Sequence, residues 1–561
     1  MWAELLNDRS FEGVLPAANW CYYDGSPDIC DRQWDTNSTW CIDTANAFNG
    51  AKCASLTAAA RPASLTQSGL SFKKGMGYTF SGHFRGARGL KATVLLKALL
   101  PTGEWMVLAS AELPRVSAEW RQYSVRLISR AESSQGIFEL RVAGHGRLWA
   151  DKLSLMPEDN QAGWRKDVVE AIREVRPGVI RWGGSSVDPG HYRWKNGIGN
   201  RDRRVPWRNE VWGRLDPNDV GIDEFCQFCA LTKCEPLICV SFADGAQSAA
   251  ELVEYCNGSA ATQWGARRAA NGHPAPYRVK YFQIGNEISG DDPQYLEQIE
   301  DFISRMKKVE PDIQILSSFP SKKLLERVGP ELSFVCPHHY TTDLAACDQD
   351  FNHIGQMLTE TPGCGQVHIA VTEWNIDAGA WGLGRGKEMT LDAALWNARY
   401  LNVMMRHSDR VKMACRSNLA NSYCGAIIET GISGSGVLKR PSYYVMYLYS
   451  HQAKPIPLAL DTSGERLDLV ACGAENKQSV VIFAVNSKPE PVELAVSFEG
   501  FGKELRLSEA ETLADTHNAG QVDVMNHWAT PERVTLRRQP VSGSTVALPG
   551  LSVTAVECEV R

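Results

Sequence analysis

Residues 280–287 read KYFQIGNE and residues 368–374 read HIAVTEW, and these two stretches decide the fold. Each is a short apolar run that ends in or next to a glutamate, Glu287 in the first and Glu373 in the second. Such runs are typical of strands buried on both faces of a parallel sheet. Further runs of this kind occur at Val179–Gly184, Pro236–Phe242, Ile313–Ser318, Phe334–Tyr340 and Lys412–Asn421.

Helical patterns lie between these runs. Pro293–Val309 carries apolar residues at the spacing of an amphipathic helix, and Ile222–Leu231 and Leu391–Arg406 do the same. Strands that alternate with helices favour parallel βα units. We therefore predict an α/β fold with a (β/α)₈-type TIM barrel, although seven predicted strands are one fewer than a closed barrel needs.

The pattern of apolar and polar residues changes on either side of this region. Short alternating segments such as Tyr78–Phe84 and Arg147–Pro157 precede it, and similar segments such as Ser479–Asn486 follow it. This pattern favours antiparallel β-sandwiches. We expect three parts: an N-terminal segment with a β-sandwich at 1–157, the barrel at 158–450, and a C-terminal β-sandwich at 451–561.

Charge and composition exclude several classes of function. The formal net charge is -6 over 561 residues, so the sequence lacks the excess of basic residues that is typical of nucleic-acid-binding proteins. No apolar run approaches the ~18 to 20 residues that span a membrane, and no signal peptide is visible. We expect a cytoplasmic protein if Met1 is the true start, and an exported one if the N-terminus is truncated.

The cysteines favour structural thiols. Cys226, Cys229 and Cys234 share one segment, but no second pair of ligands completes a zinc site, so we expect buried thiols there. The N-terminal cysteines could form disulfides in an exported protein, with free thiols as the default. We expect no metal and no cofactor.

The two glutamates suggest a reaction. A carboxylate at the end of an apolar strand is costly unless it is paired, hydrogen-bonded or used. Glycoside hydrolysis needs two carboxyl groups, one to donate a proton and one to attack the sugar. We therefore interpret Glu287 and Glu373 as a catalytic pair, with the salt-bridged strand end as the alternative. Asn286, Tyr340 and Trp374 offer an amide, a hydroxyl and an indole face to the sugar.

Four ordered motifs resemble glycoside hydrolase family 51, the α-L-arabinofuranosidases. The resemblance covers most of the chain, and its most specific stretch is RRAANGHPAPYRVKYFQIGNE at Arg267–Glu287. The others are RWGGSSVDPGHYRWKNGIGNRDRR at Arg181–Arg204, VTEWN at Val371–Asn375 and RHSDRVKMA at Arg406–Ala414.

The resemblance implies a retaining enzyme that releases terminal arabinofuranose from plant polysaccharides such as arabinan and arabinoxylan. Glu287 would be the acid/base on the fourth barrel strand and Glu373 the nucleophile on the seventh. The first strand would then be missing, ahead of an inserted jelly-roll sandwich, and Met1 would be an internal methionine. The resemblance also points to a homo-oligomer.

Further substrate contacts follow from the resemblance. Tyr340 after His338 matches the family's substrate-side pattern, whereas Ser185 stands where Asn is common and Asn418 where Gln is common. Two alternatives stay open: another retaining glycosidase, such as a β-xylosidase or endo-glucanase, and a carbohydrate-binding protein that no longer turns over.

Overall fold

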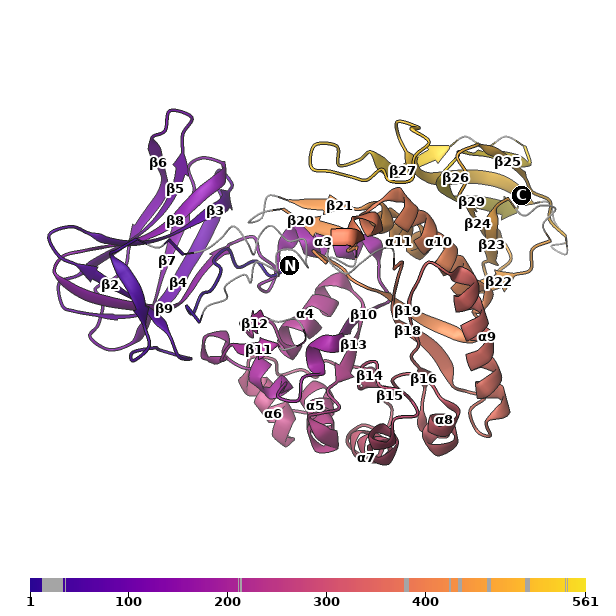
Figure 1. Cartoon of the computed structure of the whole chain (residues 1–561), viewed down its shortest axis with the longest axis horizontal. Coiled ribbons are helices and arrows are strands. Elements are labelled where there is room, and N and C mark those ends of the chain that lie inside the picture. Colours follow the sequence, from indigo (N-terminus) through magenta and orange to yellow (C-terminus); the bar gives the residue numbers. More distant parts are fainter. Residues whose placement is uncertain are drawn as a thin grey trace.

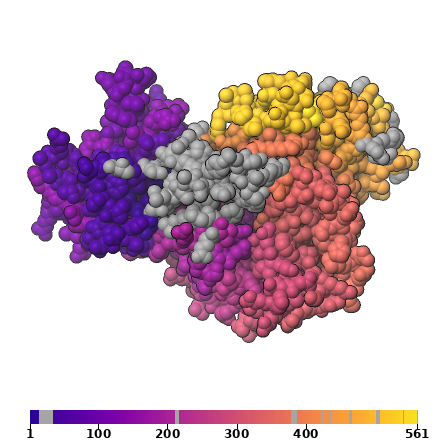
Figure 2. Space-filling view, viewed as in Figure 1, coloured from indigo at the N-terminus to yellow at the C-terminus, as the bar shows by residue number. Residues whose placement is uncertain are grey.

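A computed structural model describes the whole chain apart from residues 13–33, 36, 210, 212–213, 378–382, 423–424, 432–435, 462–465, 500–504, 540, 542 and 561. It has three parts: a β-sandwich drawn in indigo and purple, a central α/β barrel in magenta to orange, and a second β-domain toward yellow (Figure 1). The space-filling view shows the sandwich projecting to one side of the barrel (Figure 2). Within the described residues, no helix is long and apolar enough to cross a membrane.

The central sheet is parallel and follows the order of the chain. Each of the seven predicted apolar runs overlaps a strand of this sheet, and the predicted run at Phe334–Tyr340 is divided into two short strands. The strands pair in the order β10, β13, β14, β15, β16, β18, and both β17 and β19 also pair with β18. Their bounds are β10 Val179–Trp182, β13 Glu235–Val240, β14 Tyr281–Ile284, β15 Gln314–Leu316, β16 Phe334–Val335, β17 His338–Tyr340, β18 His368–Asn375 and β19 Val411–Arg416.

Amphipathic helices cover the outside of this sheet (Figure 1). The helices predicted at Pro293–Val309 and Leu391–Arg406 have those bounds, because their apolar residues form one buried stripe. The predicted (β/α)₈-type fold class is confirmed. The helices are α3 Lys166–Val175, α4 Ile222–Thr232, α5 Gly245–Asn257, α6 Gln263–Ala270, α7 Pro293–Val309, α8 Lys322–Val328, α9 Leu344–Glu360, α10 Leu391–Arg406 and α11 Pro441–Gln452.

The loops of the barrel contain short 3₁₀ turns and hairpins. The loop after β10 contains three 3₁₀ turns and a small hairpin, and a second hairpin precedes α11. These elements are η1 Gly184–Val187, η2 Trp194–Gly197, η3 Arg201–Arg203, β11 Trp207–Asn209, β12 Arg214–Asp216, η4 Gly329–Glu331, η5 Leu383–Met389, β20 Ile428–Thr430 and β21 Val437–Lys439.

The N-terminal sandwich has two antiparallel sheets, ordered β1-β2-β9-β4-β7 and β3-β8-β5-β6. Phe80, Phe84 and Phe138 are fully buried between them. The alternation that predicted this sandwich reflects inward and outward positions along each strand. The strands are β1 Trp40–Asp43, β2 Cys53–Ala58, β3 Ala63–Phe72, β4 Gly77–Gly86, β5 Lys91–Leu99, β6 Trp105–Glu112, β7 Arg121–Ile128, β8 Ser133–Ala143 and β9 Gly146–Pro157.

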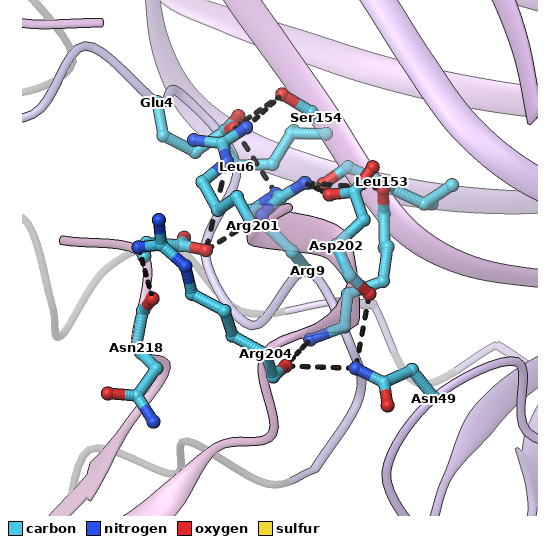
Figure 3. Close-up of polar contacts among 12 residues, drawn as sticks. Glu4, Leu6, Arg9, Asn49, Leu153, Ser154, Arg201, Asp202, Arg204 and Asn218 are labelled. Carbon is cyan, nitrogen blue, oxygen red and sulfur yellow. Dashed lines mark hydrogen bonds and ion pairs between the residues drawn. The ribbon is translucent and has the colours of Figure 1, made fainter. Parts of the chain in front are cut away.

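Buried charges join this sandwich to the barrel (Figure 3). Arg9 donates to the Leu153 carbonyl of β9 at 2.9 Å and to Asp202 Oδ1 of η3 at 2.6 Å. It also pairs with Asp219 Oδ1 at 2.8 Å. The Arg9 side chain is only 5% exposed, so these partners must offset the loss of its hydration.

The C-terminal domain packs on α10 and α11 through its six-stranded sheet, ordered β22-β23-β24-β29-β26-β27. A two-stranded sheet of β25 and β28 completes it. The strands are β22 Ile456–Leu458, β23 Asp468–Gly473, β24 Ser479–Asn486, β25 Val492–Ala495, β26 Leu505–Asp515, β27 Val534–Gln539, β28 Thr545–Leu548 and β29 Ser552–Val560.

The described cysteines carry free thiols. Cys226 and Cys229 are buried in α4, whereas Cys234 lies just beyond the end of that helix. Cys41 is exposed and Cys53 is buried. The remaining two N-terminal cysteines, at positions 21 and 30, lie outside the described residues.

Candidate active site

The two predicted glutamates meet at the carboxyl end of the parallel sheet. Glu287 follows β14, and Glu373 lies near the end of β18. One carboxylate oxygen of each glutamate and one ring nitrogen of His338 lie within 4.8 Å of one another. This separation is far below the ~6.5 to 9.5 Å of inverting glycosidases and close to the ~5 to 5.5 Å of retaining ones.

Glu373 is held as an anion. Arg181 donates from Nη1 to Glu373 Oε1 at 2.6 Å, and the Tyr340 hydroxyl donates to Oε2 at 2.8 Å. Burial by itself raises the pKa of Glu373, but the charge of Arg181, that of His338 and these hydrogen bonds outweigh it. The pKa of Glu373 therefore lies below its ordinary value.

Glu287 has a different environment. Its side chain is 43% exposed, compared with 19% for Glu373. Glu287 Oε1 lies 3.0 Å from His338 Nδ1, and His338 Nε2 lies 2.9 Å from the Thr372 hydroxyl, so the imidazole links the glutamate to β18. The two carboxyl groups are therefore electrically unequal: Glu373 is bound by a buried cation, whereas Glu287 faces solvent.

Arg181 connects three strands of the barrel. Besides Glu373, it donates from Nε to Gln283 Oε1 at 2.7 Å and from Nη2 to Asn286 Oδ1 at 2.8 Å. Its side chain is 7% exposed. Asn286 in turn donates from Nδ2 to Asp188 Oδ2 at 3.1 Å, so both ends of this amide are engaged by the protein.

Asp188 adds a third carboxyl group at the rim of the site. Burial raises its pKa to about 6, the hydrogen bond from Asn286 opposes this, and the negative charge of Glu287 adds to it. The carboxyl group of Asp188 is therefore partly protonated in weakly acidic solution.

Gly184 brings the backbone against the nucleophile. Its φ is +65°, and a Cβ at this position would lie 2.9 Å from Glu373 Oε1 and 3.4 Å from Arg181 Nη1. Only glycine combines this backbone conformation with so close an approach. Gly184, the second glycine of the VIRWGG stretch, thus makes room for the Arg181–Glu373 ion pair.

The other predicted substrate contacts are placed as follows. His338 and Tyr340 contact the two glutamates directly, and Asn286 contacts Arg181. Ser185 lies half-buried in η1, next to Gly184. Asn418 follows β19, is exposed, and lines the same cavity as Glu373.

Trp374 needs a correction. The sequence predicts that its indole faces the sugar, but its side chain is fully buried and packs on Trp396 and Tyr400. Side chains alternate along a strand, so Glu373 and Trp374 point to opposite faces of β18. Trp374 belongs to the core between the sheet and α10, where it supports the strand that carries Glu373.

The sequence places Arg181 among the polar residues at strand ends but predicts no role for it, and it gives no indication of Asp188. A signal for Arg181 was present, since it is a charged residue within the apolar run VIRW and a buried charge requires a partner. The contact between Asp188 and Asn286 joins two separate loops and has no such local signal.

Two family models match the chain. The model of the alpha-L-arabinofuranosidase 1 domain matches residues 171–357, and that of the alpha-L-arabinofuranosidase C-terminal domain matches residues 372–552. Together they span both glutamates and about two thirds of the sequence.

Curated relatives are also named as α-L-arabinofuranosidases. The intracellular exo-alpha-(1->5)-L-arabinofuranosidase 1 of Bacillus subtilis (strain 168) is 25% identical over 405 residues, covering 62% of this chain and 80% of the relative. The probable alpha-L-arabinofuranosidase C of Aspergillus fumigatus is 28% identical over 343 residues, covering 52% and 66%.

Solved structures share the fold. The arabinose-bound MgGH51 α-L-arabinofuranosidase aligns with a TM-score of 0.83 at 20% identity, over 100% of this chain and 95% of that chain. The α-L-arabinofuranosidase of Thermotoga maritima, in an arabinose complex, aligns with a TM-score of 0.63 at 22% identity, over 72% and 91%. The first alignment includes the N-terminal sandwich as well as the barrel.

Proposed function

Because the chain belongs to the α-L-arabinofuranosidases of glycoside hydrolase family 51, we propose that it releases terminal α-L-arabinofuranose from plant polysaccharides or their oligosaccharides, with retention of configuration. One observation carries the proposal: two unequal carboxyl groups lie within 4.8 Å at the end of a parallel barrel. Family membership and this intact pair favour the reaction over the β-xylosidase, endo-glucanase and non-catalytic alternatives.

The first step forms a glycosyl-enzyme ester. Protonated Glu287 gives its proton to the glycosidic oxygen, while Glu373 attacks the anomeric carbon from the opposite side of the ring. The bond to the leaving oxygen breaks, the aglycone leaves as an alcohol, and Glu373 is esterified. A nucleophile must be ionised, and Arg181 keeps Glu373 in this state by lowering its pKa. The hydrogen bond from Arg181 also orients the carboxylate.

The second step hydrolyses the ester. Glu287, now a carboxylate, takes a proton from water, and the resulting hydroxide attacks the anomeric carbon. Glu373 leaves as the anion, stabilised by Arg181 and by the Tyr340 hydroxyl. The two inversions give net retention, and both glutamates return to their starting states.

The roles of the residues around the two glutamates and the domain bounds are also part of the proposal. We propose that His338 positions Glu287, and that Tyr340, Asn286, Ser185 and Asn418 line the sugar site. We also retain the division of the chain at 1–157, 158–450 and 451–561, with catalysis in the second part. Cellular location and a homo-oligomeric state stay predictions.

The test uses aryl α-L-arabinofuranoside and aryl β-D-xyloside with the full chain. Glu373→Ala and Glu287→Ala should each lower turnover of the arabinofuranoside on the order of 10³-fold or more. Glu297→Ala, on the exposed face of α7, is the matched control and should keep full activity.

Azide then separates the two roles. With azide, Glu373→Ala should yield the inverted glycosyl azide and Glu287→Ala the retained one, as identified by proton NMR. Full activity of Glu373→Ala would defeat the nucleophile assignment. Preference of the wild-type chain for the xyloside would defeat the proposed substrate.

A further inference from the structure

Two cysteines meet where α4 ends and the chain turns into β13. Lys233 follows the helix in the left-handed conformation, with a φ of 61°. Its amide donates to the Ala230 carbonyl at 3.4 Å, and the Cys234 amide donates to the Cys229 carbonyl at 3.0 Å. These two bonds define a Schellman motif, which folds the chain back onto the last turn of the helix. The two residues that the motif brings together are Cys229 and Cys234.

The side chains of Cys229 and Cys234 are in contact as well. Cys234 Sγ lies 3.8 Å from the Cys229 carbonyl oxygen, and the Cys229 thiol donates a hydrogen bond to the Cys234 sulfur. A disulfide needs two neighbouring backbones and side chains that point toward each other. The backbone hydrogen bond and the contact between the thiols supply both, so a bond between the sulfur atoms requires little movement of α4 or β13.

The two thiols differ in exposure and in acidity. Cys229 is 1% exposed, whereas Cys234 is half-buried. The hydrogen bond from Cys229, together with that from the Thr232 hydroxyl 3.3 Å away, outweighs burial and the charge of Glu235, so the pKa of Cys234 lies below its ordinary value. Cys234 is therefore the accessible nucleophile, and Cys229 is the buried partner placed to react with its oxidised form.

A second pair of thiols differs from this one in exposure. Cys226 of α4 donates to the sulfur of Cys256 in α5, so these two thiols also touch. Both are buried, with exposed fractions of 5% and 0%. A reagent in solution reaches neither of them, and the Cys226–Cys256 pair is therefore an internal control for thiol contact without access.

From these observations we propose that Cys229 and Cys234 form a modification site, a dithiol that a hydroperoxide oxidises to a reversible disulfide. The site lies at the amino end of β13, whereas Glu287 and Glu373 lie at the carboxyl ends of their strands. The inference does not depend on the proposed glycosidase reaction.

With hydrogen peroxide the chemistry has two steps. The Cys234 thiolate attacks one peroxide oxygen, the S–O bond forms as the O–O bond breaks, and the departing hydroxide takes up the proton released by Cys234 and leaves as water. Cys229 then loses its proton and attacks the sulfenic sulfur of Cys234. The S–S bond forms, the S–O bond breaks, and hydroxide leaves with that proton as a second water. The thiols lose two electrons, which the peroxide gains, and a dithiol reductant reverses the change.

The test treats the full chain, reduced and then freed of reductant, with a small excess of hydrogen peroxide. The remaining thiols are blocked with N-ethylmaleimide in denaturant. Trypsin cleaves after Lys233, between the two cysteines, so a disulfide keeps the two peptides joined and tandem mass spectrometry identifies the bonded residues. We expect the Cys229–Cys234 bond to form about tenfold faster than a Cys226–Cys256 bond, or more, and dithiothreitol to remove it.

Three variants assign the roles. In Cys229→Ser, Cys234 should stop at the sulfenic acid, which dimedone traps, and in Cys234→Ser, Cys229 should stay reduced. Thr232→Val keeps the shape of the side chain but removes the hydroxyl beside Cys234, and it should slow the first step severalfold. Thr359→Val, on the exposed face of α9, is the matched control and should leave the rate unchanged.

Three outcomes would overturn the proposal. Equal rates for the two pairs would show that contact alone decides oxidation. Oxidation of Cys229 at the wild-type rate in Cys234→Ser would show that Cys234 is not the nucleophile. A Cys234 that N-ethylmaleimide labels in the native protein, but that forms no bond to Cys229 with peroxide, would show that the two sulfur atoms cannot bridge.

Discussion

Arg181 Nη1 lies 2.6 Å from Glu373 Oε1, so the charge that holds the proposed nucleophile comes from a different strand, β10, and not from β18, which carries Glu373. The same guanidinium reaches Gln283 and Asn286 on and after β14. One cation therefore fixes the relative positions of the two strands that carry Glu287 and Glu373. The relative positions of the two catalytic glutamates therefore depend on Arg181 of β10 as well as on β14 and β18.

Arg181→Met should impair catalysis in a pH-dependent way. The variant leaves Glu373 buried without its cation, so the pKa of Glu373 rises and the anionic form is lost at a higher pH. We expect kcat/KM to fall on the order of 10²-fold or more at neutral pH, and the acidic limb of its pH profile to move to higher pH. Steady-state kinetics from pH 4 to 9 measure both effects.

The control for this experiment is Arg267→Met, an exposed position on α6. It should leave the profile unchanged. An acidic limb that stays in place in Arg181→Met would mean that Arg181 does not govern ionisation of Glu373.

Gly184→Ala should damage the site without unfolding the protein. The added methyl group would lie 2.9 Å from Glu373 Oε1 on a backbone with φ of +65°, so either the ion pair or η1 must shift. Misplacement of about 1 Å can lower turnover on the order of 10²-fold. We expect a large loss in kcat with native circular dichroism. Gly75→Ala also has positive φ but meets no atom within 4 Å, and it should retain activity.

Trp374→Phe distinguishes a core residue from a sugar contact. The indole is fully buried against Trp396 and Tyr400, so the smaller ring leaves a cavity and should lower the melting temperature measurably. KM for the aryl arabinofuranoside should stay within about twofold, because core residues do not touch the substrate. A large rise in KM with an unchanged melting temperature would restore the substrate role.

Much of the catalytic face could be predicted from the sequence. Strands buried on both faces read as apolar runs, and parallel strands place their carboxyl ends at one edge of the sheet. The proximity of Glu287 and Glu373 could therefore be predicted from the sequence alone. Their separation within 4.8 Å could not, because it depends on strand tilt and register.

The remaining differences have local causes. Trp374 was assigned to the site because it adjoins Glu373 in sequence, whereas strand alternation turns adjacent side chains to opposite faces. The role of Arg181 could not be predicted because its partners Gln283, Asn286 and Glu373 are about 100 to 190 residues away along the chain. The division of the predicted strand into β16 and β17 reflects a shift in pairing along β18.

Arg9→Met should weaken the junction between sandwich and barrel, and acid should reduce the difference from wild type. In the native protein burial raises the pKa of Asp219, but the charges of Arg9, Arg201 and Lys152 outweigh this and hold it below the ordinary value. A carboxyl group with a depressed native pKa contributes stability above its unfolded pKa of about 3.9 and loses it as pH falls through the native pKa. At pH 7 the variant leaves buried carboxylates without their cation, which costs about 3 to 5 kcal/mol in comparable cases.

Calorimetric melting temperatures at pH 7 and near pH 3.5 check this linkage. We expect Arg9→Met to melt well below the wild type at pH 7 and closer to it in acid, where the carboxyl groups begin to accept protons. Arg126→Met is the matched control: it removes a surface ion pair with Glu158 in the same sandwich, and it should change little at either pH. An Arg9→Met deficit that is the same at both pH values would show that Arg9 acts through packing and not through its charge.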